Sequence, residues 1–328
     1  MPIALVLTLS TVCFVSSKGY RILATLFAVN LGAGPLSTGI LFALWGVFPF
    51  VLSIYAGRVA DRFDNRLLMY YGLTGFSVSL ALPWFVPGLP ILYVSAALGG
   101  LTSMLFVVAT QNLVGVLSPT TKLRTRNFSY YSLGESMAAI AGPVLVGLSI
   151  DAFRHPFSFA LLALLNSVCL VLLFAARKVI PYTVPKDEDR KAARNAKDLL
   201  ALPALHNALL ANGVVMAGLD LFVLYMPIYA HSLGHSATTI GLVMGAFGAA
   251  GIIVRLAIPP VTARWGEHRM MSAMLALSAL AFVAAPFTEH AFMLGAVAFV
   301  IGLGLGCGQP LTMILSFNAA PPGRAGAA

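Results

Sequence analysis

Long runs of apolar residues, separated by short polar turns, make up most of the chain. Each run is long enough for an α-helix that crosses a bilayer, which takes about 20 residues. The ten runs cover residues 3–29, 37–56, 67–86, 90–116, 129–150, 157–176, 204–231, 238–258, 269–287 and 290–317. This pattern predicts an all-α membrane protein with about ten transmembrane helices.

The link between the second and third runs is short and densely charged. It extends from Gly57 to Arg66, with an apolar run on either side. About ten residues can only return the chain to the same side of the membrane, because backbone inside lipid must be helical. The two runs therefore predict a transmembrane helical hairpin whose link lies in water.

The composition excludes an ordinary soluble domain. Hydrophobic residues are 59% of the chain and charged residues 9%, whereas soluble domains are about one-quarter charged. The net charge of +9 does not indicate a nucleic-acid partner, because basic residues beside membrane helices usually reflect topology. Cys13, Cys169 and Cys307 lie within apolar runs without Cys-x-x-Cys spacing, so we interpret them as buried hydrophobic residues. We expect no metal and no cofactor.

The charged link also carries a motif, Gly-x-x-x-Asp-Arg-x-x-x-Arg. Its defining positions are Gly57, Asp61, Arg62 and Arg66. The motif resembles the signature loop of the major facilitator superfamily of secondary transporters. The match is partial, because the family usually has glycine where Asp64 stands and a basic residue where Asn65 stands. The resemblance implies a helical bundle with two pseudo-symmetric halves and a role for this loop in conformational gating. The alternative is a cytoplasmic hairpin that simply collects arginines.

Lys and Arg are distributed unevenly between the two sets of loops. The set that includes the signature loop holds 17 of the 20 basic residues, and the opposite set holds only Arg154. Lys18 and Arg21 lie within the first run. Because basic residues concentrate on the cytoplasmic side, the N-terminus and the signature loop are expected there. We expect a multi-pass protein of the inner (plasma) membrane.

A polar insert at residues 177–203 divides the chain. It predicts a cytoplasmic linker between an N-terminal six-helix bundle (1–176) and an incomplete C-terminal bundle of four helices (204–328). A shift of 202 residues aligns 31–69 with 233–271 without a gap and places Arg264 on the position of Arg62. Such a repeat predicts two halves related by an axis along the membrane normal.

Members of the superfamily generally have twelve helices, six in each half. The chain ends after Pro-Pro-Gly-Arg (321–324), a turn that is expected to lead into an eleventh helix. The resemblance therefore predicts six plus four helices and a chain cut short after the tenth.

The fifth run carries a second resemblance. Gly142, Pro143 and Gly147 match part of a glycine-rich motif found in the antiporter branch of the superfamily. Small residues allow close helix packing, and proline bends a helix and frees a carbonyl group. The motif favours an antiporter, and ordinary small-residue packing remains the alternative.

Four of the ionisable residues inside the apolar runs are candidates for function: Lys18, Arg21, Glu135 and Asp220. A charge at mid-bilayer costs about 3 kcal/mol, so it normally faces a polar cavity or a partner. The 202-residue shift makes Asp220 equivalent to Lys18. The resemblance implies that the first and seventh helices line a central cavity, with Lys18 and Asp220 facing each other across it.

Two interpretations of these charges stay open. In one, they bind substrate or carry the coupling proton, and Asp220 is the first candidate because burial stabilises a protonated carboxyl group. In the other, Lys18 and Arg21 extend to the membrane interface and Asp220 forms a structural salt bridge.

The remaining polar candidates, Glu135, Gln111 and Gln309, also have two interpretations each. For Glu135, pairing with a cytoplasmic-side arginine is favoured over a proton-carrying role. Gln111 and Gln309 are uncharged candidates for lining the cavity, or else form hydrogen bonds between helices.

These patterns predict secondary active transport of a small molecule by alternating access, coupled to protons, with efflux by antiport preferred. The expected partners are a small-molecule substrate, H⁺ and the lipid bilayer, with the protein as a monomer. The alternative is a non-transporting membrane remnant or sensor built on the same fold. An enzyme is less favoured, because the sequence has no metal-ligand cluster, phosphate loop or nucleophile elbow.

Overall fold

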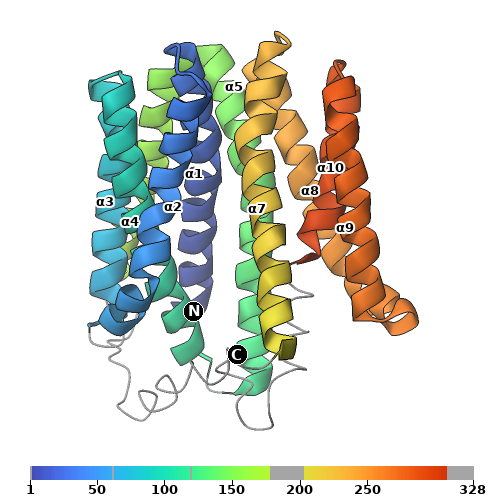
Figure 1. The fold of residues 1–328 in the computed structure, drawn as a ribbon. Helices are drawn as coiled ribbons and strands as arrows, with labels where there is room; N and C mark the ends of the chain where they lie inside the picture. Colours follow the sequence, from blue (N-terminus) through green and yellow to red (C-terminus); the bar gives the residue numbers. More distant parts are fainter. Residues whose placement is uncertain (1, 61–62, 119, 178–202, 309–328) are drawn as a thin grey trace. The chain divides into compact units, whose positions relative to one another are not determined.

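The computed structural model describes residues 2–60, 63–118, 120–177 and 203–308, and these residues form helices and turns without a strand (Figure 1). The elements are α1 (Pro2–Asn30), α2 (Pro35–Ala60), α3 (Asn65–Phe85), α4 (Leu89–Val116), α5 (Thr121–Ala175), α7 (Pro203–Ser232), α8 (Ala237–Trp265), α9 (Glu267–Ala284), the 3₁₀ turn η3 (Ala285–Phe287) and α10 (Ala291–Gly306). Within these ranges, seven helices are long and apolar enough to cross a membrane. The predicted all-α membrane bundle is confirmed.

Most helix ends lie close to the ends of the predicted apolar runs, but α5 already begins at Thr121 and α8 continues to Trp265. The runs 129–150 and 157–176 belong to the single assigned helix α5, in which Arg154 has φ 67° and ψ 168°. This backbone conformation is essentially restricted to glycine, so Arg154 interrupts the helix. Pro156, two residues later, lacks the N–H group that would continue the preceding turn. The predicted break between two spans is therefore present inside α5.

Local side-chain caps explain where several helices begin. Asp64 caps α3, because its carboxylate accepts a hydrogen bond from the backbone N–H of Arg66. Thr120 caps α5 by accepting a bond from the N–H of Leu123. Each cap satisfies one of the N–H groups that a helix start leaves without an intrahelical partner.

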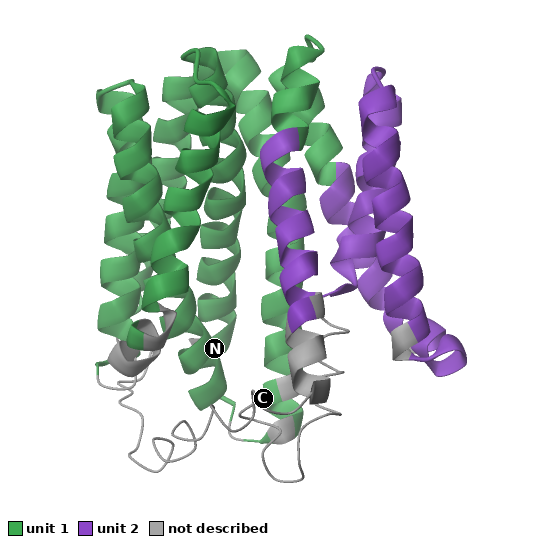
Figure 2. Ribbon diagram, in the orientation of Figure 1, with its two compact units in different colours: residues 1–184, 226–245 green, residues 185–225, 246–328 purple. Residues whose placement is uncertain are grey.

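Close packing divides the chain into two compact units, coloured separately in Figure 2. Unit 1 consists of residues 1–184 and 226–245. Within it α1 packs against α5, and α4 packs against both α2 and α3. Tyr20, Phe76, Phe106 and Phe159 are among its largest fully buried side chains. Unit 1 therefore holds a core of its own, and the end of α7 and the start of α8 belong to it.

Unit 2 consists of residues 185–225 and 246–328. Within it α9 packs against α10. The Phe222 ring of α7 stacks on the Phe247 ring of α8, with centroids 4.5 Å apart. A second cluster of buried apolar side chains includes Ile258, Met270 and Met271.

The helix boundaries repeat along the chain. α1 ends 202 residues before α7, and the same interval separates the starts of α2 and α8, of α3 and α9, and of α4 and α10. At the equivalent turns Gly32 and Gly234 have φ of 80° and 82°. The N–H of each glycine donates to the carbonyl three residues earlier, at 2.9 Å in both. Positive φ is accessible to glycine at little cost, which explains why both turns carry it.

The packing inside each unit repeats as well. Tyr20 stacks on Trp45 in unit 1, with centroids 4.8 Å apart, at positions equivalent to Phe222 and Phe247 in unit 2. A Cβ atom on Gly100 would collide with the carbonyl oxygen of Trp45, and one on Gly302 would collide with that of Phe247. The internal repeat inferred from the sequence therefore extends to backbone approach and ring stacking.

Candidate functional site

An ion pair joins two helices inside unit 1. Nζ of Lys18 on α1 lies 3.3 Å from Oε1 of Glu135 on α5, and about a third of each side chain is exposed, 34% and 36% respectively. Each charge alone would be costly at membrane depth, and pairing offsets that cost. The sequence favoured an arginine as the partner of Glu135. The structure instead pairs it with Lys18, which reaches across to α5.

The glycine-rich motif brings these two helices together. A Cβ atom on Gly142 of α5 would lie 2.7 Å from the carbonyl oxygen of Val15 and 2.9 Å from the backbone nitrogen of Gly19 on α1. A Cβ atom on Gly19 would in turn lie 2.9 Å from Cγ2 of Val146. Helices approach this closely only where side chains are absent. Gly142 and Gly19 therefore set the separation of α1 and α5 at the level of Lys18.

Tyr131, a buried residue one turn before Glu135 on α5, has neutral polar neighbours. Its hydroxyl lies near the Thr110 and Gln111 side chains and interacts electrostatically with the Glu135 carboxylate. It makes no hydrogen bond of normal geometry within the described part of the chain. Gln111 is exposed. The ion pair thus supplies a base and an acid, with a phenol one turn away on α5, and such groups can bind a polar ligand or exchange a proton.

The other intramembrane candidates occupy separate places. Arg21 lies about one turn from Lys18 on α1, and its guanidinium carbon is 4.2 Å from the centroid of the Phe42 ring, a cation–π contact. Asp220 lies on α7 in unit 2 with its side chain exposed. Its position facing Lys18 stays a prediction. Gln309 lies outside the described residues.

The signature loop is described in part. Gly57 lies in the last turn of α2, while Asp61 and Arg62 lie outside the described residues. In the repeat copy, Arg264 is exposed in the last turn of α8, where a cation interacts favourably with the helix dipole.

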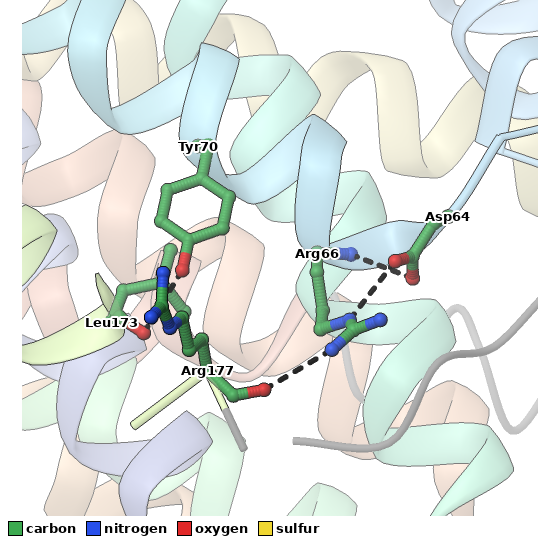
Figure 3. A network of polar contacts seen from close by, with 5 residues as sticks. All are labelled: Asp64, Arg66, Tyr70, Leu173 and Arg177. Atoms are coloured by element: carbon green, nitrogen blue, oxygen red, sulfur yellow. Dashed lines mark hydrogen bonds and ion pairs between the residues drawn. The ribbon is translucent and has the colours of Figure 1, made fainter. Parts of the chain in front are cut away.

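The described end of the loop forms a polar network at the start of α3 (Figure 3). The carboxylate of Asp64 accepts from the backbone N–H of Arg66 at 3.2 Å and from its Nε at 2.9 Å. A terminal nitrogen of Arg66 donates to the carbonyl oxygen of Arg177 at 3.1 Å. One turn along α3, the Tyr70 hydroxyl donates to the carbonyl oxygen of Leu173 at 3.1 Å. The network ties the loop to the end of α5.

Asp64 was a departure from the family motif in the sequence, and its role was missed. It is 5% exposed, which requires a partner for its charge. The sequence did hold a signal, because an aspartate directly before an apolar helical run is a typical N-cap.

No group of three or more His, Cys, Asp or Glu side chains that could hold a metal ion occurs among the described residues. The arrangement consists of ion pairs and hydrogen bonds between membrane-spanning helices. Together with the apolar spans, it defines the class of multi-pass helical membrane proteins.

The sequence profile of the Major Facilitator Superfamily matches residues 6–328. The chain therefore belongs to the major facilitator superfamily, and it is a transport protein for small molecules and not an enzyme. The chain is 26% identical over 286 residues to the class C tetracycline resistance protein of Escherichia coli, covering 83% of this chain and 69% of that protein. It is 26% identical over 278 residues to Multidrug resistance protein 1 of Bacillus subtilis (strain 168), covering 82% and 69%.

Solved structures show the same fold. The crystal structure of the nucleoside transporter NupG superposes with a TM-score of 0.76 at 16% identity, covering all of this chain and 85% of NupG. The peptide transporter POT in complex with sulfate superposes with a TM-score of 0.77 at 17% identity, covering 99% and 84%. At this identity the likeness establishes the fold alone.

Proposed function

We propose that the chain is a secondary active transporter that exports a small molecule across the inner membrane in exchange for protons. The resistance activities in the names of its relatives, which include tetracycline, multidrug and quinolone resistance proteins, support efflux. The glycine-rich motif of α5, typical of antiporters by resemblance, supports exchange. In this proposal residues 1–176 and 204–328 form the two halves that rock about a central site. The linker and signature loop lie in the cytoplasm, and the protein acts as a monomer.

The ion pair between Lys18 and Glu135 is the observation on which the proposal rests most directly. A proton on Glu135 would neutralise the carboxylate and leave Lys18 without its partner. An unpaired charge in a membrane site is costly, so the protonated state favours a conformation or a ligand that satisfies Lys18. The two protonation states therefore prefer different arrangements, which is what coupling of proton and substrate requires. Asp220, equivalent to Lys18 in the repeat, is the second candidate for carrying the proton.

Efflux of tetracycline, a quinolone and a lipophilic cationic dye from cells that lack their own exporters provides the test. Inverted membrane vesicles with an acidic lumen would then report exchange through an acridine dye. The fluorescence of the dye recovers as protons leave the lumen in exchange for each added compound. We expect recovery with at least one compound and its loss in Glu135→Gln, with Asp220→Asn as the parallel variant. Glu289→Gln, an exposed acid in the turn before α10, serves as the control.

Other outcomes would contradict specific parts of the proposal. Compound binding without accumulation or efflux would indicate a sensor built on this fold. Transport that persists after an uncoupler collapses the proton gradient would exclude proton coupling. Full proton exchange in both Glu135→Gln and Asp220→Asn would remove these carboxylates from the mechanism.

A further inference from the structure

A carboxylate on one helix completes the cap of another helix that lies 86 residues away in the chain. Oδ1 of Asp151, on α5, accepts from the backbone N–H of Ala237 at 3.1 Å, and Oδ2 accepts from the N–H of Thr238 at 2.7 Å. These are the first two N–H groups of α8, which have no intrahelical partner. Ser236 caps the third, through the bond from the N–H of Thr239 to its hydroxyl at 3.2 Å. A negative charge at this place also interacts favourably with the helix dipole.

Next to this cap, the backbones of α5 and α8 are in close contact. A Cβ atom on Gly241 of α8 would lie 2.5 Å from the carbonyl oxygen of Pro143 and 3.3 Å from Cα of Gly147. A Cβ atom on Gly147 would collide with the carbonyl oxygen of Ala237. Pro143, Gly147 and Asp151 are spaced four residues apart, so they lie along one face of α5. The rest of the glycine-rich motif therefore packs against α8, on a different partner from the one that Gly142 meets.

The internal repeat supplies a comparison for this contact. Gly39 stands at the position of Gly241 in the first half, and a Cβ atom there would meet nothing within 4 Å. Glycine at this position is therefore not demanded by the helix itself. The close approach at Gly241 is specific to the second half and to its contact with α5.

The two compact units agree with this contact between α5 and α8. The hairpin formed by residues 226–245 belongs to unit 1, while the remaining described parts of α7 and α8 belong to unit 2 (Figure 2). The helices α7 and α8 thus change packing partners along their lengths. At the end of the bundle opposite the signature loop, they are attached to the N-terminal helices.

We infer that Asp151 is a positioning residue that clamps the 226–245 hairpin onto α5 and must release it during transport. Two charge-assisted bonds hold the clamp closed. Because Asp151 is exposed, water can replace the protein donors when the clamp opens, so opening does not leave a buried charge. The packing of Gly147 against α8 gives the closed state a defined register. The role in transport rests on the proposed function, whereas the clamp itself does not.

The first test measures opening of this clamp without any substrate. Val144 of α5 contacts Gly245, since a Cβ atom on Gly245 would lie 3.0 Å from Cγ2 of Val144. The native residues Cys13, Cys169 and Cys307 are buried, so Val144→Cys provides a distinguishable reporter for labelling by N-ethylmaleimide. Adding Asp151→Asn should raise the labelling rate about fivefold, because the neutral side chain bonds more weakly to two N–H donors and the open state gains population. Adding Glu289→Gln instead should leave the rate unchanged.

A second test asks whether the clamp must open. In the variant with Asp151→Cys and Ala237→Cys, a short bifunctional methanethiosulfonate should abolish transport of whichever compound the wild type carries, and dithiothreitol should restore it. A labelling rate unchanged by Asp151→Asn, or full transport by the cross-linked protein, would overturn the inference. If Asp151→Asn does not yield folded protein, Asp151→Glu gives the labelling comparison, with an expected rise of about twofold from the displaced carboxylate. Failure of the proposed function would instead appear as no transport by the wild type while the labelling rates still differ.

Discussion

Replacing Asp64 by alanine should destabilise unit 1 although the side chain lies outside the membrane-spanning part of α3. The substitution removes the cap of α3, which is worth about 1 kcal/mol. It also removes the charge-assisted contact with Nε of Arg66 at 2.9 Å, worth about 1 to 2 kcal/mol in a partly buried setting. With Asp64 5% and Arg66 23% exposed, solvent screens this contact only weakly. We expect a total loss of about 2 to 3 kcal/mol in unfolding free energy.

Two conservative variants divide this loss into its parts. Asp64→Asn keeps a cap acceptor and loses the charge, so it should cost about 1 kcal/mol. Asp64→Gly installs the residue usual in the family and keeps part of the cap preference, so it should cost about 2 kcal/mol. The unfolding free energy can be measured by titrating SDS into protein held in mild detergent, with tryptophan fluorescence as the signal.

A double-mutant cycle between Asp64→Ala and Arg66→Gln isolates the contact itself. The coupling energy should be about 1 kcal/mol, because the two side chains touch and share one network. Additive effects, within about 0.3 kcal/mol, would show that the ion pair contributes nothing. An alanine variant as stable as the wild type would refute the reasoning from burial as well.

Four further substitutions give expected outcomes. Gly142→Ala should push α5 away from α1 and cost about 2 kcal/mol by overpacking, with loss of transport. Gly213→Ala, where a Cβ atom meets nothing within 4 Å, should instead stabilise α7 by up to about 1 kcal/mol; equal shifts in the thermal unfolding midpoint would contradict the packing argument. Arg154→Gly should raise stability by about 1 kcal/mol, because glycine adopts φ 67° without strain, and the same midpoint checks it. Tyr20→Phe removes the bond to the Ser95 hydroxyl at 3.0 Å and should cost about 1 kcal/mol. A loss of more than about 3 kcal/mol would mean that the hydroxyl, and not the ring, holds this core together.

The helices and the repeat were predictable because their signals are local. A run of apolar residues fixes the length of a membrane helix, and the breaks fall where turn residues stand. Gly32 and Gly234 were aligned from sequence alone, and both adopt positive φ. The same shift placed Tyr20 with Phe222, and each stacks on an aromatic residue of the following helix.

The partners within the site were not predictable, because they depend on which helices touch. Glu135 follows several arginines in the chain, so local spacing favoured one of them. Its partner Lys18 lies 117 residues earlier in the chain. The close packing of α1 against α5 at Gly19 and Gly142 brings the two side chains together. Asp151 drew no attention in the sequence, since an acid near a turn is usually solvated. Its meaning depends on Ala237 and Thr238 starting a helix beside it.

The two halves show where packing alone explains a residue and where it does not. At equivalent positions, Gly100 and Gly302 make the same close approach to the helix before them, so the fold accounts for both. Lys18 and Asp220 are also equivalent, yet they carry opposite charges, and shared packing gives no reason for either. For Lys18 the reason lies within unit 1, because its Nζ pairs with Glu135 on α5 and pairing offsets the cost of a charge in a membrane helix. The comparison of the halves therefore separates Gly100 and Gly302, which the shared fold explains, from Lys18, which is explained by its partner Glu135 on α5.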